Sequence, residues 1–336
     1  MPSPCSVSTV RLSRDLAEQG YTYAELARMT RHAELVRVRR GTYVAASEQA
    51  IDPRVAHLQL LEATAAQSSS DLVVSHASAA VLHGLPVGND QLDRVHLTQH
   101  RHGQGRIRRY VHLHGAALGA DDVTEVNGFR VTGLSRTVLD LSCALRPLLA
   151  VPIGDAALRA GMTTDELAQR LSESHHRHGI ARARRTATLL DPRSESPGES
   201  MSRVVFAEHR IALPIPQLEV FDGLGRFVGR CDFGWEEERT LGEFDGKQKY
   251  GRLLLRPGQS PEDALFEEKQ REDRLRDLGW QVVRWVGDER RRRRAGISRS
   301  VDGSGGSPSL RGRMVASRDV GAGHRLSEGG QADAPV

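Results

Sequence analysis

The stretch LGEFDGKQKY, residues 241–250, brings carboxylates and amines together at a two-residue spacing. Side chains alternate across a β-strand, so Glu243, Asp245 and Lys247 would point to the same face of one strand. Carboxylates that share a face repel one another unless a cation neutralises them, and hard ions such as Mg²⁺ prefer oxygen ligands. We therefore interpret Glu243 and Asp245 as candidate ligands of a divalent metal ion.

A third carboxylate comes from the preceding segment VGRCDFGW, which contains Asp232. If this segment pairs with residues 239–245 as a hairpin, Asp232 lies beside Glu243 or Asp245 across the ladder. The three carboxylates then form the expected Mg²⁺ site. The alternative is a surface turn, because Asp245-Gly246 is a strong turn signal and charged residues are common near hairpin ends.

The placement of lysine supports the chemical interpretation. The chain has 44 arginines and only three lysines, and two of the lysines, Lys247 and Lys249, follow the acidic pair. A lysine amine can shift its pKa toward neutrality, whereas a guanidinium stays protonated. We expect Lys247 to assist a metal-bound water that attacks a phosphodiester, and Lys249 to hold the nucleic-acid backbone.

The N-terminal 50 residues carry a different pattern. A helical stretch ends near Gly20, and a second helix starts at Thr22, where Glu25 three residues later completes a capping box. The alternating run LVRVRRGTYVA then predicts a hairpin. Helices followed by a basic hairpin indicate a winged helix-turn-helix, with DNA contacts expected from Arg37, Arg39 and Arg40. The alternative is a helical cap whose hairpin packs on its neighbour.

Residues 51–190 are expected to mix helices and short strands. The predicted helices span 53–66, 75–82, 134–145 and 164–172, and the predicted strands span 94–98, 110–114 and 129–132. His112 and His114 would share one face of a strand, which makes a metal site conceivable, with surface histidines as the alternative. No other motif in this segment indicates a chemical activity.

A segment rich in proline, serine and charge, LDPRSESPGES, predicts a linker before the last domain. Periodicity then predicts the order helix, three strands, helix, strand between residues 197 and 286. Residues 290–336 hold ten arginines and four acidic residues without periodicity, and we expect them to be disordered. The prediction is an α+β multidomain protein divided into residues 1–50, 51–190, 191–289 and 290–336.

Composition restricts the class of protein. The hydrophobic content of 38% suffices for ordinary cores, and the three distant cysteines suggest neither a disulfide framework nor a thiolate zinc site. No apolar run approaches the ~20 residues of a membrane span, and the N-terminus lacks the apolar core of a secretory signal. We expect a cytoplasmic protein with no membrane partner.

Residues 196–286 resemble the domain family related to very-short-patch-repair endonucleases, within the PD-(D/E)xK nuclease superfamily. The matching segments are SPGESMSR, CDFGW, EFDGKQKY and REDRLRDLGWQVVRW. The resemblance implies a restriction-endonuclease-like α/β sheet in which Asp232 and either Glu243 or Asp245 bind the metal. It also implies that Glu199 contributes from the first helix. Two registers stay open, Asp245-Gly246-Lys247 and Glu243-Phe244-Asp245.

Residues 10–141 are similar to proteins with an AbiEi-type antitoxin domain. The matching segments are ELVRVRRGTYV, VSHASAAVLHGLP and VTGLSRTVLDL. This resemblance implies a DNA-binding winged helix in a protein of an abortive-infection toxin-antitoxin system. Two functions are therefore expected: a DNA-binding, Mg²⁺-dependent endonuclease, or a non-catalytic regulator or antitoxin that binds a promoter and has a cognate toxin as its partner.

Overall fold

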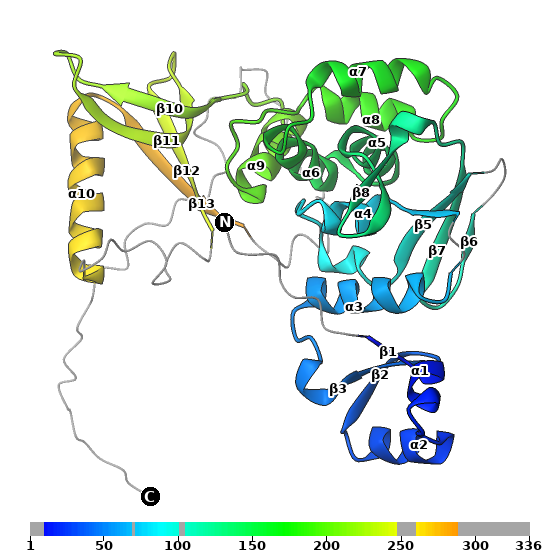
Figure 1. Ribbon diagram of the computed structural model, residues 1–336. Helices are drawn as coiled ribbons and strands as arrows, with labels where there is room; N and C mark the ends of the chain where they lie inside the picture. Colours follow the sequence, from blue (N-terminus) through cyan, green and yellow to red (C-terminus); the bar gives the residue numbers. More distant parts are fainter. Residues whose placement is uncertain (1–9, 69–70, 101–104, 247–259, 288–336) are drawn as a thin grey trace, which may run out of the picture. The chain divides into compact units, whose positions relative to one another are not determined.

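The computed structural model describes residues 10–68, 71–100, 105–246 and 260–287 (Figure 1). The protein combines helices with mixed and antiparallel sheets, as expected for the α+β class. Its described part divides into two compact units, residues 1–216 and 217–336. Lys247, Lys249 and the segment 290–336 lie outside the described residues. No described helix has the length and apolarity that a membrane crossing requires.

The first unit begins with a small three-stranded sheet and two helices. The elements are β1 (Arg11–Leu12), α1 (Ser13–Glu18), α2 (Tyr23–Arg31), β2 (Leu35–Arg39) and β3 (Thr42–Ala45). The strand order is β1-β3-β2, and both pairings are antiparallel. The expected capping box is confirmed, because Thr22 and Glu25 bind each other's backbone N–H at the start of α2. Leu16, Leu26 and Leu35 form the core of this part.

A six-stranded mixed sheet lies at the centre of the first unit. Its strands are β4 (Leu72–Val74), β5 (Val95–His100), β6 (Arg106–Ile107), β7 (Val111–Ala116), β8 (Val123–Val126) and β9 (Phe129–Thr132). The order is β6-β7-β5-β4-β9-β8. The central strand β4 runs antiparallel to β5 and parallel to β9, and β5 runs parallel to β7. This register places His96 beside His112 and Thr98 beside His114.

Two helices, α3 (Pro53–Ala65) and α4 (His76–Leu82), pack on this sheet. Leu61 of α3 belongs to the same buried cluster as Val95 and Leu97 of β5. Side chains alternate across a strand. His96 lies between Val95 and Leu97, so its side chain points to the other face of the sheet. The same argument applies to the histidines of β7, whose neighbours Val111 and Leu113 join that cluster.

Five helices complete the first unit with a second core. They are α5 (Leu134–Ala144), α6 (Pro147–Arg159), α7 (Thr164–Glu173), α8 (Ile180–Ala187) and α9 (Pro197–Glu208). The segment predicted to be a linker is ordered, because the backbone N–H of Asp191 donates to Asp155 at 2.7 Å and Ser194 is buried. Helix α9 packs against α6. The compact units therefore separate after residue 216 rather than at 190.

The second unit contains one sheet and one long helix. Its elements are β10 (Ile215–Phe221), β11 (Phe227–Trp235), β12 (Thr240–Asp245), α10 (Pro261–Asp277) and β13 (Gln281–Val286). The sheet order is β10-β11-β12-β13, with β11 and β12 antiparallel and β12 and β13 parallel. Leu275 of α10 is fully buried against Leu241 and Cys231. The predicted succession of elements is observed, although its first helix belongs to the first unit.

A buried ion pair joins α6 to α9. Arg203 donates to the carboxylate of Asp155 at 2.6 Å, and both side chains are almost fully buried. Burial raises the pKa of Asp155 even though Arg203 opposes the shift. A buried carboxylate that loses its only cationic partner keeps the cost of desolvation without the compensating attraction.

We expect Arg203→Met to lower the free energy of unfolding of the first unit by about 3–5 kcal/mol. Asp155→Asn combined with Arg203→Met should recover most of this loss, because the amide oxygen still accepts the Asp191 N–H. Urea unfolding followed by far-UV circular dichroism measures both. Arg185→Met is the matched control, because Arg185 is exposed on α8. A loss in the single variant no larger than in this control would show that the pair contributes little.

Candidate functional site

The acidic residues predicted from the sequence lie on adjacent strands of the second unit. Asp232 is on β11, and Glu243 and Asp245 are on β12, which runs antiparallel to β11. The carboxylate of Asp232 accepts a hydrogen bond from the backbone N–H of Phe244 at 2.8 Å. Asp232 therefore reaches the part of β12 that lies between the other two carboxylates.

Two arginines balance the charge of the Glu243 carboxylate. Its carboxylate, on a residue only 7% exposed, forms ion pairs with Arg271 of α10 and with Arg284 of β13, the latter at 3.0 Å. Both arginines also bind Glu268. The hydrogen bond to Glu268 and the bonds to Glu243 raise the pKa of Arg271, so this guanidinium stays charged. Each carboxylate oxygen of Glu243 therefore already contacts a guanidinium, and a Mg²⁺ ion bound there would have to share that oxygen with an arginine or replace it.

Glu199, expected to complete the metal site, belongs to the first unit. Its carboxylate accepts hydrogen bonds from the hydroxyl of Ser196 at 2.7 Å and from the backbone N–H of Glu195 at 2.8 Å. These contacts form the N-terminal cap of α9, whose first N–H groups have no partner within the helix. The contacts of Glu199 are thus those of a helix cap. The two lysines of the predicted site, Lys247 and Lys249, lie outside the described residues.

The arginines of the predicted DNA-binding hairpin differ in exposure. Arg37 and Arg40 are exposed on β2 and at the turn that follows it. Arg39 instead packs toward α3, where its guanidinium donates to the hydroxyl of Thr64 at 2.7 Å. Partial burial lowers the pKa of Arg39. We therefore assign Arg39 to the packing of the hairpin on α3 and keep Arg37 and Arg40 as candidate DNA contacts.

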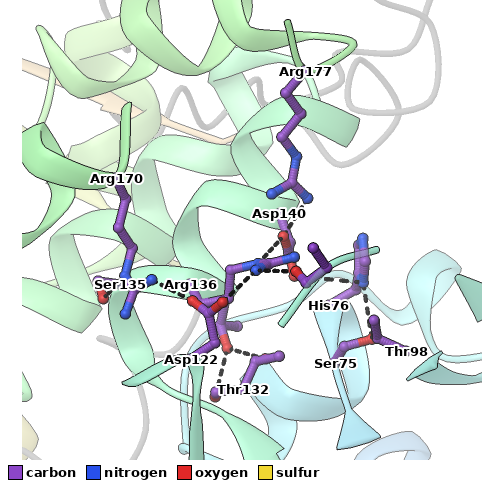
Figure 2. A network of polar contacts seen from close by, with 12 residues as sticks. Ser75, His76, Thr98, Asp122, Thr132, Ser135, Arg136, Asp140, Arg170 and Arg177 are labelled. Atoms are coloured by element: carbon purple, nitrogen blue, oxygen red, sulfur yellow. Dashed lines mark hydrogen bonds and ion pairs between the residues drawn. The ribbon is translucent and has the colours of Figure 1, made fainter. Parts of the chain in front are cut away.

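Sequence reasoning did not find a buried polar network in the first unit (Figure 2). Asp140 of α5 is 1% exposed, and its Oδ1 accepts hydrogen bonds from Arg136 at 2.9 Å and from Arg177. Arg136 also donates to Asp122 at 2.8 Å, and Arg170 donates to the same carboxylate. Burial opposes the ionisation of Asp140, but the surrounding cationic groups hold its pKa below the usual value.

His76, the first residue of α4, stands at the edge of this network. Its Nδ1 lies 3.9 Å from Oδ2 of Asp140 and 3.0 Å from the hydroxyl of Ser75, which in turn accepts a hydrogen bond from Thr98 (Figure 2). The backbone of His76 has φ near 50°. This left-handed conformation is costly for a residue other than glycine and is concentrated at functional sites.

Two further imidazoles converge on His76. The ring of His114 stacks on it with the ring centroids 3.7 Å apart, and Nδ1 of His96 lies 3.0 Å from Nε2 of His114. Burial lowers the pKa of His76 to about 4 and that of His96 to about 3, and it also lowers the pKa of His114. The three rings are therefore uncharged at neutral pH, with lone pairs available for a ligand.

The signal for this cluster in the sequence was incomplete. His112 and His114 were recognised because they are two residues apart on one strand. His96 joins them through the parallel register of β5 and β7, and His76 joins them through the chain direction at the start of α4. Neither long-range pairing can be read from local spacing.

No known family profile matches the chain. Two similar proteins are the uncharacterized proteins MT2308 and Rv2248 of Mycobacterium tuberculosis, from strains CDC 1551 / Oshkosh and ATCC 25618 / H37Rv. Each is 29% identical over 274 residues, which cover 81% of this chain and 92% of the relative. The crystal structure of the RV2827C protein from the same species matches with a TM-score of 0.37 at 16% identity, covering 64% of this chain and 84% of that chain. The names of these proteins state no activity.

A second buried histidine, His57 of α3, contacts the residues around this cluster. His57 is 2% exposed, and its ring nitrogens lie 2.9 Å from the carbonyl oxygen of Leu92 and 2.9 Å from the hydroxyl of Ser78. Burial lowers the pKa of His57, although the hydrogen bond to Leu92 opposes the shift. The folded protein keeps this ring neutral at pH values at which the unfolded chain, with a pKa of about 6.5, binds a proton.

Stability should therefore decrease as the pH falls below about 6.5, by up to about 1.4 kcal/mol per pH unit for each such histidine. His57→Gln should make this pH dependence shallower by up to one proton, whereas the exposed His176→Gln should not. Urea unfolding at pH 7.5 and 5.5 tests this prediction. Far-UV circular dichroism is the readout, because all three tryptophans lie in the second unit and their fluorescence would not report on the unit that contains His57. An unchanged pH dependence in His57→Gln would contradict the assignment.

Proposed function

We propose that the protein is a DNA-binding regulator that uses its N-terminal part, residues 10–50, to bind a specific duplex sequence in the cytoplasm. Helix α2 enters the major groove, and the β2–β3 hairpin contacts phosphates. The observation that carries this proposal is the exposed outer face of α2 next to an exposed, basic hairpin. The resemblance to AbiEi-type antitoxins would add a cognate toxin as a protein partner.

The order of elements supports a winged helix-turn-helix. A short strand, two helices and a hairpin follow one another, and the last strand of the hairpin returns between the other two strands. In this class of domain the second helix is presented to the groove while the hairpin lies against the backbone of the duplex. Helix α2, the second helix, contacts β2 of the hairpin.

The two faces of α2 differ as a recognition helix requires. Leu26 is buried, and Met29 packs on the same core, so these residues hold the helix in place. The opposite face exposes Tyr23, which is 81% exposed, together with Arg28 and Arg31. Residues 21–45 contain five arginines and two glutamates, so this surface is positively charged. Arginine and tyrosine side chains can contact base edges and phosphates from such a position.

A duplex selected from a random library with the full-length protein provides the test of this proposal. We expect Arg37→Ala to weaken binding to selected and shuffled duplexes alike. The loss of one phosphate contact should also make the plot of log affinity against log salt concentration less steep, by about 0.9 in slope. Arg28→Ala should instead reduce the preference for the selected duplex, by about 1–3 kcal/mol if it contacts a base. Fluorescence anisotropy at several salt concentrations measures both effects.

Arg185→Ala is the matched control, because Arg185 is exposed on α8 in the same unit. Arg39→Ala should lower the free energy of unfolding and leave DNA affinity nearly unchanged, because the guanidinium of Arg39 donates to Thr64 of α3 rather than facing solvent. If no duplex is enriched, or if the Arg37 and Arg28 variants bind like the control, the proposal is wrong.

A second candidate function is Mg²⁺-dependent hydrolysis of phosphodiesters by the second unit. The observation that favours it is the position of Asp232, whose carboxylate binds the backbone of β12 between Glu243 and Asp245. In this candidate, Asp232, Glu243 and Asp245 hold the metal ion and Lys247 assists the attacking water. The arginine pairs of Glu243 favour the non-catalytic regulator instead.

The second candidate predicts that purified protein nicks supercoiled plasmid when Mg²⁺ is added and that Asp232→Asn reduces the rate at least 100-fold. Glu219→Gln is the control, because Glu219 is an exposed carboxylate on β10 of the same sheet. Gel electrophoresis over several hours measures the nicked fraction. Nicking that persists in Asp232→Asn would indicate a contaminating nuclease, and its absence in the wild-type protein would leave DNA binding alone.

A further inference from the structure

We propose that His76, His96 and His114 form a binding site for a divalent transition-metal ion, with zinc as the ion that the donors fit best. The site lies in the first unit, and none of its three residues belongs to the proposed DNA-binding surface. Within the residues that the structure describes, it is the group of three metal-binding side chains whose donor atoms converge, all within 4.8 Å of one another.

The spacing of one pair of ring nitrogens is close to that of tetrahedral coordination. Zinc–nitrogen bonds are about 2.0–2.1 Å long, so two imidazoles on one tetrahedral zinc ion have donor atoms about 3.3 Å apart. Nδ1 of His96 and Nε2 of His114 are 3.0 Å apart. Both polar contacts of the His76 ring use Nδ1, which leaves Nε2 for the metal. The three donor atoms lie within 4.8 Å of one another, so an ion would bind to all three after the rings rotate and the hydrogen bond between His96 and His114 opens.

The backbone holds the three histidines in place before any ion binds. The parallel register of β5 and β7 sets Thr98 beside His114. His96 is two residues before Thr98 on the same strand, so its side chain lies on the same face of the sheet as that of His114. The backbone N–H of His96 donates to the hydroxyl of Ser78 at 2.8 Å, which links β5 to α4. His76 is held at the start of α4 with φ near 50°. Its ring stacks on that of His114, and a left-handed backbone at a residue other than glycine is the kind of cost that binding sites retain.

An unpartnered atom provides independent evidence for a missing ligand. Oδ2 of Asp140 is buried and has no hydrogen-bond partner, whereas buried polar atoms nearly always have one. This oxygen lies 3.9 Å from Nδ1 of His76. A histidine that binds a metal through one nitrogen donates its other N–H, very often to a carboxylate. Metal at Nε2 of His76 would fix the proton on Nδ1, which lies 3.0 Å from the hydroxyl of Ser75 and 3.9 Å from Oδ2 of Asp140, so a small shift of the ring would give this oxygen a donor.

The donor set selects the class of ion. Imidazole nitrogens suit zinc, copper, nickel and iron, whereas Mg²⁺ and Ca²⁺ prefer oxygen. His96 and His114 are partly exposed, which gives an ion access. Three protein nitrogens leave a fourth position for water or another ligand, as in zinc sites that are not purely structural.

The first experiment uses the full-length wild-type protein without a polyhistidine tag. After treatment with a chelator and dialysis, we expect one equivalent of Zn²⁺ to bind in isothermal titration calorimetry. Co²⁺ should give visible absorption bands of a four-coordinate ion, and Zn²⁺ should remove them. A folded wild-type protein that binds no equivalent of either metal, or only octahedral Co²⁺, would overturn the proposal whatever the variants do.

Variants then locate the site. His96→Ala and His114→Ala should each weaken Zn²⁺ binding at least 100-fold, and Asp140→Asn should weaken it about 10- to 100-fold through loss of the orienting carboxylate. His112→Gln is the matched control, because its ring stacks on His114 with centroids 3.9 Å apart but is outside the converging group. It should bind within threefold of the wild type. His114→Gln replaces His114→Ala if circular dichroism shows that the latter is unfolded.

Exposed histidines could bind zinc on their own, so a further variant removes three of them together. His175, His176 and His178 lie between α7 and α8. Their combined replacement by alanine should leave the tight equivalent and its Co²⁺ spectrum unchanged. If the equivalent disappears in this variant, or if it persists in both His96→Ala and His114→Ala, the ion binds elsewhere and the assignment is wrong.

Discussion

The buried carboxylate of Asp140 is the constraint on which the arrangement of the first unit depends. An ionised carboxylate removed from water is costly unless cations and hydrogen-bond donors surround it. Arg136 comes from the same helix four residues earlier, and Arg177 comes from the segment before α8. His76 approaches from the start of α4. Two segments distant in sequence, those of Arg177 and His76, must therefore meet at α5, which joins the helical layer to the end of the sheet.

A second buried acid has the same effect on α9. Asp155 accepts hydrogen bonds from Arg203 of α9 and from the backbone of Asp191 just before it. The segment rich in proline and serine is thereby fixed on α6, although its composition is typical of a linker. Composition describes the preferences of an isolated segment, whereas the position of Asp155 is a property of the folded unit. The division of the chain into compact parts was for this reason not predictable from composition.

The elements that could be predicted are those with a complete local signal. Helix α2 has a capping box and an apolar face, and it starts within one residue of the predicted start. Helix α6 was missed because Pro152 and Gly154 interrupt its pattern, and α8 because it presents mostly arginine and alanine. The strands β4, β6 and β8 have two to four residues each, too few for a period to be recognised.

The residues that surround each candidate site could not be predicted from local spacing either. The two sites also differ in how their charge is balanced. Spacing alone placed Glu243 on a strand, but the arginine that neutralises it, Arg271, is 28 residues further along the chain. With Arg284 added, the charges at Glu243 are balanced by the protein itself. The imidazoles of His76, His96 and His114 present the opposite case, because they are neutral and bring lone pairs together beside a carboxylate oxygen without a partner. A cation is therefore proposed for the second arrangement, whereas in the first it would compete with two guanidinium groups that are already in place.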